Sequence, residues 1–167
     1  QDRVPHAVLL AGRPGIGKRA LAAWLATQHL AKSSASKAPS HPWSVPEHAD
    51  LYWLQPPVDK QTIGVEQIRS LVTELALTSY EGRGKVAVIE PANAMTDSAA
   101  NSLLKTLEEP SGNALLILVA DSVGRLPATI FSRCQRLGVP VPAEDAALAW
   151  LDRLEPNAAE DWRGVLK

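Results

Sequence analysis

A glycine-rich stretch near the N-terminus has the residue types of a phosphate-binding loop. The segment GRPGIGKR, residues 12–19, has the spacing GxxxxGK. In such a loop the glycines let backbone N–H groups face phosphate oxygens, and the lysine binds the outer phosphates. The pattern predicts a nucleotide or phosphate site formed by Gly12, Gly15, Gly17, Lys18 and Arg19. The alternative is a tight turn that joins a strand to a helix and holds no ligand.

The residue that follows the lysine departs from this pattern. A Ser or Thr hydroxyl normally binds Mg²⁺ at this position, but the chain has Arg19. A guanidinium is a permanent cation with no acceptor atom, so it cannot be a metal ligand. We therefore do not expect the loop to hold a Mg²⁺–nucleotide in a productive geometry.

Two elements must position this loop. Residues 7–11, AVLLA, are an unbroken apolar run, which is typical of a strand buried on both faces of a parallel sheet. Beyond the loop, apolar residues recur at helical spacing, which predicts a helix from residue 18 to about residue 31. Strand, glycine-rich turn and helix are the context that a phosphate-binding loop requires.

Strands and helices alternate along the rest of the chain. Further strands are expected at residues 51–54, 85–89, 114–120 and 136–139. Helices are expected to start at Gly64, after the N-cap Thr96, over residues 127–132 and over residues 143–154. This alternation predicts an α/β domain of three layers with a mostly parallel, five-stranded sheet.

The totals restrict the class of protein. The chain has 167 residues with 17 basic and 18 acidic side chains, so its near-zero net charge gives no global attraction to nucleic acid. A lone Cys134 excludes an internal disulfide and fits a reducing compartment. No stretch approaches the roughly 18 apolar residues of a membrane span, and residues 1–6 do not have the basic-then-apolar pattern of a leader. We expect a cytoplasmic protein, and the chain as given to be a fragment of a longer one.

Three stretches carry a more specific resemblance: RVPHA at residues 3–7, NSLLKTLEEP at 101–110 and LPATIFSRC at 126–134. In this order they resemble the AAA+ subunits of DNA polymerase clamp loaders, over about residues 3–140. The resemblance implies an AAA+ P-loop domain over residues 1–141 and the beginning of a helical lid domain over residues 142–167. The family's C-terminal collar domain has no counterpart in this chain.

Measured against that family, the catalytic positions are altered. The family's third strand leads into an Asp–Glu pair that orients the metal and activates water, whereas this chain has Glu90 and Pro91. Proline offers no general base. Glu90 is either an altered metal ligand or an ordinary charge at a strand end. The residue that senses the γ-phosphate corresponds to Ala120, and Asp121 after it would repel a triphosphate. These departures predict that the chain alone does not hydrolyse ATP.

Arg133, within the Ser-Arg-Cys stretch, resembles the family's arginine finger. Such a finger reaches across a subunit boundary and stabilises charge on the nucleotide that the neighbouring subunit holds. We therefore predict that Arg133 is the catalytic residue of this chain, acting in trans. The alternative is an ion pair with a local carboxylate. The adjacent Cys134 is predicted to be a small buried apolar residue.

Two further positions have roles that the resemblance implies. Lys105 would lie at the inner side of the clamp-loader ring and contact DNA phosphate, or couple the DNA site to the nucleotide site. A local pair with Glu108, three residues later on the same helix, is the alternative. His6 would lie near the adenine, or have a structural role.

No metal site is predicted. Many bacterial members of the family carry a four-cysteine zinc module after the first helix, but residues 32–46 contain no cysteine. His41 and His48 are too few to replace it. The only cofactor considered is a nucleotide or phosphate at the altered loop.

The leading hypothesis is a non-hydrolysing AAA+ subunit of a DNA polymerase holoenzyme. The resemblance implies that its partners are the gamma/tau-type ATPase subunits, a delta-type subunit, the sliding clamp and, through the assembled complex, primed DNA; no membrane is involved. One rival is an autonomous P-loop ATPase or kinase in which Glu90 binds the metal. Another is an AAA+ module of a different DNA-processing machine.

Overall fold

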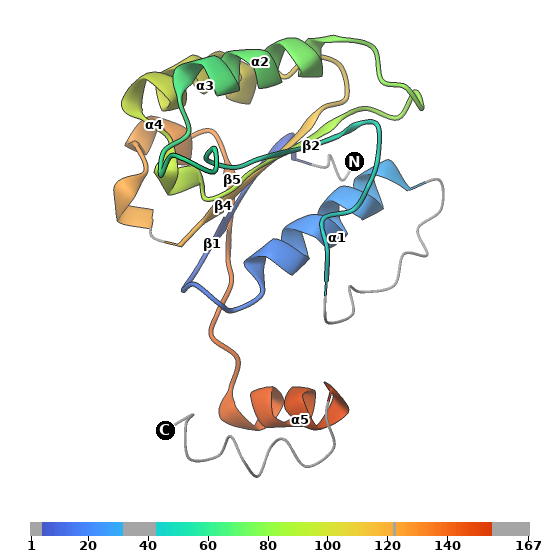
Figure 1. Ribbon diagram of the computed structural model, residues 1–167, viewed down its shortest axis with the longest axis vertical. Coiled ribbons are helices and arrows are strands. Elements are labelled where there is room, and N and C mark those ends of the chain that lie inside the picture. The colour runs from blue at the N-terminus through green and yellow to red at the C-terminus, as the bar shows by residue number, and fades with distance from the viewer. Residues whose placement is uncertain (1–4, 32–42, 122, 155–167) are drawn as a thin grey trace.

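Five parallel strands form the central layer of the molecule (Figure 1). The computed structural model describes residues 5–31, 43–121 and 123–154. Arg3, Val4, His41 and residues 155–167, which are the second half of the predicted lid, lie outside the described residues. The sheet order is β2-β3-β4-β1-β5. The strands are β1 (Ala7–Ala11), β2 (Leu51–Leu54), β3 (Val86–Ile89), β4 (Leu115–Ala120) and β5 (Gln135–Gly138).

Helices cover both faces of this sheet. Helix α1 lies on one face, while α2 and α3 lie side by side on the other (Figure 1). A strand that returns parallel to its neighbour needs such a crossover. The α-helices are α1 (Lys18–Leu30), α2 (Val65–Ala76), α3 (Asp97–Glu108), α4 (Ala128–Phe131) and α5 (Glu144–Leu154), and the short 3₁₀ turns are η1 (Ala92–Ala94) and η2 (Val123–Arg125).

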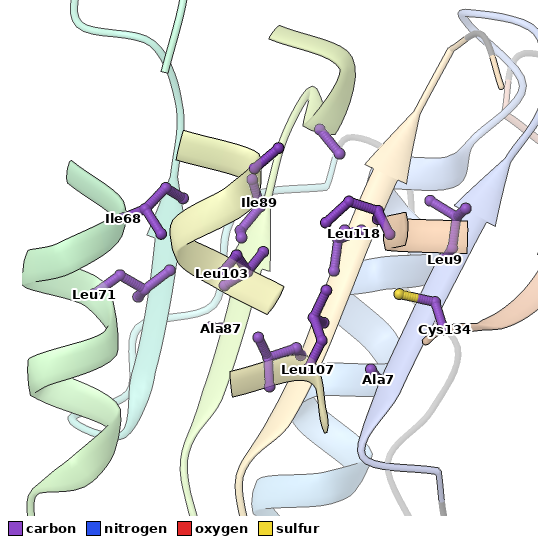
Figure 2. Packing of buried hydrophobic residues seen from close by; sticks show 14 of the residues in the cluster. Ala7, Leu9, Ile68, Leu71, Ala87, Ile89, Leu103, Leu107, Leu118 and Cys134 are labelled. Atoms are coloured by element: carbon purple, nitrogen blue, oxygen red, sulfur yellow. The ribbon is translucent and has the colours of Figure 1, made fainter. Parts of the chain in front are cut away.

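The hydrophobic core is divided by the sheet. Every residue of β3 and β4 is buried, as expected for central strands covered on both faces. On the side of α2 and α3, Ile68, Leu71 and Leu103 point toward the sheet residues Ile89 and Leu118 (Figure 2). A second cluster packs α1 against the opposite face. All four residues of β5 are exposed, so one edge of the sheet is open to solvent in the described residues.

The sequence-based expectations for this fold are confirmed. All five predicted strands form, and the observed element bounds differ from the predicted ones by at most one residue. Thr96 caps α3, accepting a hydrogen bond from the Ala99 N–H at 3.2 Å. At the start of α2, the Gly64 N–H donates to Gln67 Oε1 at 3.1 Å. Local capping chemistry therefore sets where these helices begin.

The predicted division into two domains stays a prediction. Helix α5 follows β5 and stands away from the sheet in Figure 1. Its described residues match the helix expected at the start of a lid, but residues 155–167 lie beyond the described part. Among the helices that the structure describes, none combines the length and apolar character needed to cross a membrane.

A buried carboxylate holds the turn that precedes β3. Asp50 is fully buried and accepts hydrogen bonds from Ser79 Oγ at 2.9 Å, the Tyr80 N–H at 2.8 Å and the Glu81 N–H at 3.0 Å. Burial by itself raises the pKa of Asp50, but these hydrogen bonds and the nearby His48 outweigh it and hold the pKa below its usual value of 3.8. The ionised form is therefore the one that folding favours.

The pH dependence of stability is expected to reflect Asp50. Because its pKa is lower in the folded than in the unfolded state, its contribution is complete above pH 3.8 and is lost as pH falls below that value. Chemical denaturation across pH 2–7 should show Asp50→Asn less stable than the wild type at neutral pH, with the difference shrinking in acid. Asp59→Asn, which removes an exposed carboxyl, is the control. A difference that does not change with pH would contradict the prediction.

Candidate functional site

The candidate site lies where the parallel strands end. The glycine-rich loop follows β1, Glu90 follows β3 and Asp121 follows β4. All strands are parallel, so these segments come together at one edge of the sheet. This is the edge at which open α/β sheets bind their ligands.

The loop glycines are required by the backbone itself. A Cβ atom on Gly12 would lie 2.5 Å from the Val139 carbonyl oxygen and 2.6 Å from Ile16 Cδ1, so no larger residue fits there. Gly15 and Gly17 have φ values of 82° and 92°, a conformation that other residues rarely adopt. Gly17 is also the N-cap of α1. The glycine spacing is therefore explained by the turn between β1 and α1, whether or not a phosphate binds.

Lys18 is engaged inside the protein. Its side chain is buried, with Nζ 2.7 Å from Asp121 Oδ1 and donating to the Arg13 carbonyl at 2.5 Å. The Asp121 N–H in turn donates to Asn93 Oδ1 at 3.1 Å. This hydrogen bond holds the backbone of Asp121 in place beside Lys18. The positive charge that a phosphate loop offers to its ligand is thus paired with a carboxylate. A phosphate group would have to compete with Asp121 for Lys18.

Arg19 and Glu90, the two residues predicted to stand at altered metal-binding positions, form an ion pair. Arg19 Nε lies 2.5 Å from Glu90 Oε1. The other carboxylate oxygen, Oε2, accepts from Trp53 Nε1 at 2.9 Å and from Gln55 Nε2 at 3.3 Å. Glu90 is only 7% exposed, so nearly all of its hydrogen-bonding capacity is met by these three side chains.

Two tryptophans surround this ion pair. The Arg19 guanidinium lies over the ring of Trp43, 5.1 Å from its centroid. The rings of Trp43 and Trp53 are 6.0 Å apart and tilted by 37°. A guanidinium over an aromatic face gains a favourable electrostatic contact. The pair is therefore part of a packed cluster that joins the start of α1 to β2 and β3.

These residues do not fit a magnesium ion. Mg²⁺ requires oxygen ligands in octahedral geometry. Arg19 contributes no acceptor, and both oxygens of Glu90 are bound to donors from Arg19, Trp53 and Gln55. A cation placed here would also meet the positive charge of the guanidinium. The side chains suit an internal Arg–Glu pair and do not suit a metal-bound nucleotide.

Pro91 and Ala120, the remaining altered positions, have side chains without polar groups. Pro91 follows Glu90 through a cis peptide bond and carries no group that can accept a proton. Ala120 is fully buried at the end of β4, and its carbonyl accepts a hydrogen bond from the Gly12 N–H at 3.3 Å. Neither side chain can polarise water or sense a phosphate oxygen.

Arg133 lies just after α4 and is held by a carboxylate. Its Nε donates to Glu108 Oε1 at 2.6 Å, and its Nη2 also contacts that oxygen. Its Nη1 donates to the Thr129 carbonyl at 3.0 Å and to Ser132 Oγ at 3.3 Å. The local pairing that was the alternative to a finger is thus present in the isolated chain. A trans role requires that part of the guanidinium still reach a neighbour.

Other predicted residues have structural surroundings. Lys105 is exposed on α3, and among the described residues no ion pair joins it to Glu108, whose carboxylate binds Arg133 instead; the alternative of a local Lys105–Glu108 pair is not observed, and the role of Lys105 stays a prediction. His6 Nε2 lies 2.8 Å from the Leu107 carbonyl, at the end of β1 opposite the glycine-rich loop. Cys134 is buried in the core, and burial raises the pKa of its thiol to about 11.

In the part of the chain that the structure describes, no three His, Cys, Asp or Glu side chains lie close enough together to hold a metal ion. His48 instead has Nε2 3.6 Å from Glu81 Oε1 and its Nδ1 accepts from the Asp50 N–H at 3.0 Å. His41 lies outside the described residues.

Sequence reasoning missed the residues that complete the site. Trp43, Trp53 and Gln55 bind or cover the Arg19–Glu90 pair. Trp53 and Gln55 lie at the end of a predicted strand, and parallel strands end at the same edge of the sheet. Their place in the sequence could therefore have indicated that they lie near Glu90. Nothing in the sequence separates Glu108 from the other carboxylates as the partner of Arg133.

Comparison with known proteins supports a single family. The family described as "DNA polymerase III, delta subunit" matches residues 1–142. The chain belongs to this family. Among curated members, the DNA polymerase III subunit delta' of Pseudomonas aeruginosa is 41% identical over 91% of this chain and 48% of its own length. The corresponding subunit of Bacillus subtilis is 37% identical over 96% of this chain and 46% of its own length.

The family assignment confirms the resemblance to clamp-loader subunits of the delta-prime type. The chain spans about half the length of the curated relatives it matches. A DNA polymerase III gamma-subunit-related protein from Thermotoga maritima has a TM-score of 0.68 at 24% identity, covering 91% of this chain and 46% of that one. A RuvB Holliday junction branch migration motor from the same organism has a TM-score of 0.65 at 20% identity, covering 93% and 47%. These two structures establish the shared α/β fold alone.

Proposed function

We propose that this chain is a non-hydrolysing AAA+ subunit of a replicative clamp loader. In this role it supplies Arg133 in trans to the nucleotide site of a neighbouring ATPase subunit and helps load the sliding clamp onto primed DNA. The observation that carries the proposal is the Arg19–Glu90 ion pair, which occupies the positions of both metal-binding side chains. Family membership supplies the polymerase III context.

The altered positions support this proposal jointly. Arg19 replaces the hydroxyl that binds Mg²⁺, Pro91 replaces the base, and Ala120 replaces the polar residue that senses phosphate. Hydrolysis of a phosphoanhydride depends on electrostatic stabilisation by a metal and on a positioned nucleophile. A site that lacks these parts and neutralises its own lysine with Asp121 is suited to keeping the loop's shape without turnover.

Arg133 fits the complementary role. Its side chain is about a third exposed, so it lies at the surface where a neighbour can approach. A guanidinium stays charged at any physiological pH and presents a planar set of N–H donors that matches phosphate oxygens. The partners proposed for the assembled ring are gamma/tau-type ATPase subunits, a delta-type subunit and the clamp.

The rival function is an autonomous P-loop ATPase of another DNA-processing machine. It shares the AAA+ fold, which the branch migration motor named above also has. It requires Glu90 to hold a metal ion, and thus requires the contacts from Arg19, Trp53 and Gln55 to be broken. The cost of breaking them disfavours this rival.

The two functions differ in ATP turnover by the purified full-length protein. We expect no Mg²⁺-dependent turnover above background, because no side chain in the site binds the metal or activates water. Lys18→Ala should therefore leave the background rate unchanged, as should the control Lys60→Ala, which removes an exposed lysine. A measurable turnover that disappears in Lys18→Ala and persists in Lys60→Ala would establish the rival.

A further inference from the structure

The contacts of Arg133 come from two different helices. Glu108, the last residue of α3, binds the Nε side of the guanidinium, while the Thr129 carbonyl and Ser132 Oγ bind Nη1 from α4 and its C-cap. Ser132 Oγ itself donates to the Thr129 carbonyl at 3.1 Å. Helices α3 and α4 pack against each other. The guanidinium is thus held by residues of two helices that pack together and not by a loop alone.

Helix stability does not account for Glu108 at this position. The C-terminal end of a helix carries partial negative charge, so a carboxylate in the last turn is unfavourable there. Glu108 is the last residue of α3, and the adjacent C-cap Glu109 is a second carboxylate. The favourable contact available to Glu108 is with Arg133, to which a single oxygen binds through both Nε and Nη2.

The binding mode leaves one part of the guanidinium available. A guanidinium has five N–H groups, one on Nε and two on each Nη. Glu108 engages the Nε N–H and one on Nη2, and Nη1 faces Thr129 and Ser132. Within the described residues, the second N–H of Nη2 has no acceptor. This N–H is the one that can bond to an oxygen outside the chain while the other contacts persist.

We infer that Glu108 is a positioning residue for Arg133. The inference rests on the proposed function, in which Arg133 acts on a neighbour's nucleotide. Arg side chains have many rotamers, and a finger that must find its geometry after docking loses much of its effect. By holding the Nε side, Glu108 orders the guanidinium before the neighbouring subunit arrives, and leaves the Nη2 N–H to meet a phosphate oxygen.

A double-mutant experiment in the reconstituted clamp-loader complex, built with full-length protein, tests this inference. Glu108→Ala should lower kcat for ATP by about 10- to 100-fold, the range expected for a misplaced group, with KM for ATP and complex assembly unchanged. Glu108→Gln keeps one acceptor oxygen and should recover part of the rate. In an Arg133→Ala background, Glu108→Ala should have no further effect, because it acts only through the arginine. Glu109→Ala, the same charge change one residue later, is the control.

Specific results would overturn the inference. An equal fall of kcat in the wild-type and Arg133→Ala backgrounds would mean that Glu108 acts elsewhere. A rise of kcat in Glu108→Ala would mean that the contact withholds Arg133 from the nucleotide.

A second measurement separates this inference from the proposed function. In ¹⁵N NMR of the full-length protein, the Arg133 Nε–H should be rigid in the wild type and mobile in Glu108→Ala, but unaffected by Glu109→Ala. If Arg133→Ala leaves turnover unchanged, the finger is wrong. If Arg133 Nε–H mobility does not change in Glu108→Ala, positioning by Glu108 is wrong, whatever the finger does.

Discussion

Replacing Arg133 with alanine is expected to slow hydrolysis at the neighbouring nucleotide site that it faces by on the order of 10³-fold, as for the better-studied arginine fingers. The reason is that a permanent planar cation is removed from the place where charge develops on the phosphoryl oxygens. Single-turnover ATP hydrolysis by the reconstituted complex measures this effect. Arg133→Lys keeps a charge but not the planar set of donors, so it should recover only a small part of the rate.

The loss should not come from unfolding or failed assembly. Arg133 pairs with Glu108, whose side chain is half exposed, and such pairs contribute about 0–1 kcal/mol to stability. Gel filtration and thermal melts of the Arg133→Ala complex should therefore resemble those of the wild type. Arg125→Ala, which removes another exposed arginine, is the matched control. Unchanged hydrolysis in an intact Arg133→Ala complex would show that this residue is not a finger.

The second large effect concerns stability and the altered loop. Arg19→Ala is expected to lower the free energy of unfolding by about 1–3 kcal/mol, because it leaves the buried Glu90 carboxylate without its counter-charge. This loss of stability should be smaller than the loss from breaking a fully buried ion pair, because Trp53 and Gln55 still donate to Glu90 and because Arg19 is half exposed. Urea denaturation of the full-length protein at pH 7 measures it.

Two variants make this prediction specific. Arg69→Ala breaks an ion pair with Glu66 in which both side chains are largely exposed, and should cost at most about 0.5 kcal/mol. Adding Glu90→Gln to Arg19→Ala removes the buried charge while keeping an acceptor for Trp53, so part of the lost stability should return. If Arg19→Ala costs no more than Arg69→Ala, the ion pair is not what holds this end of the sheet.

The fold could be predicted from the sequence because its signals are local. A run such as AVLLA at Ala7–Ala11 or LLILVA at Leu115–Ala120 has no polar face, and its short length between turn residues favours a strand covered on both sides. The glycines mark a turn: Gly12 leaves no room for a larger side chain, and Gly15 and Gly17 adopt a positive φ that other residues rarely adopt. Thr96 marks the start of α3 by its own hydroxyl. Each of these depends on a few neighbouring residues.

The partners of the charged groups could not be predicted in this way. In the sequence, Glu90 is a charge at the end of a predicted strand with no evident partner. In the fold, β2 pairs with β3 so that Leu54 lies beside Ile89, and this register places Trp53 and Gln55 within hydrogen-bonding distance of Glu90. Likewise Arg133 and Glu108 are 25 residues apart and meet because α3 packs on α4. Ion pairs across such distances depend on the packing of whole elements, which periodicity does not specify.

The sequence by itself determined that this chain has a parallel α/β fold with a glycine-rich turn after the first strand, and that two positions predicted to bind metal and activate water hold replacements, Arg19 and Pro91, whose side chains can do neither. It did so because each replacement changes the chemistry of a single side chain, as from a hydroxyl to the guanidinium of Arg19. Only the tertiary structure decided what the replacements do: Arg19 neutralises Glu90, and Asp121 neutralises Lys18. The physical reason is that an ion pair requires two side chains within a few ångströms, and only the folded sheet brings the ends of β1, β3 and β4 to the same place.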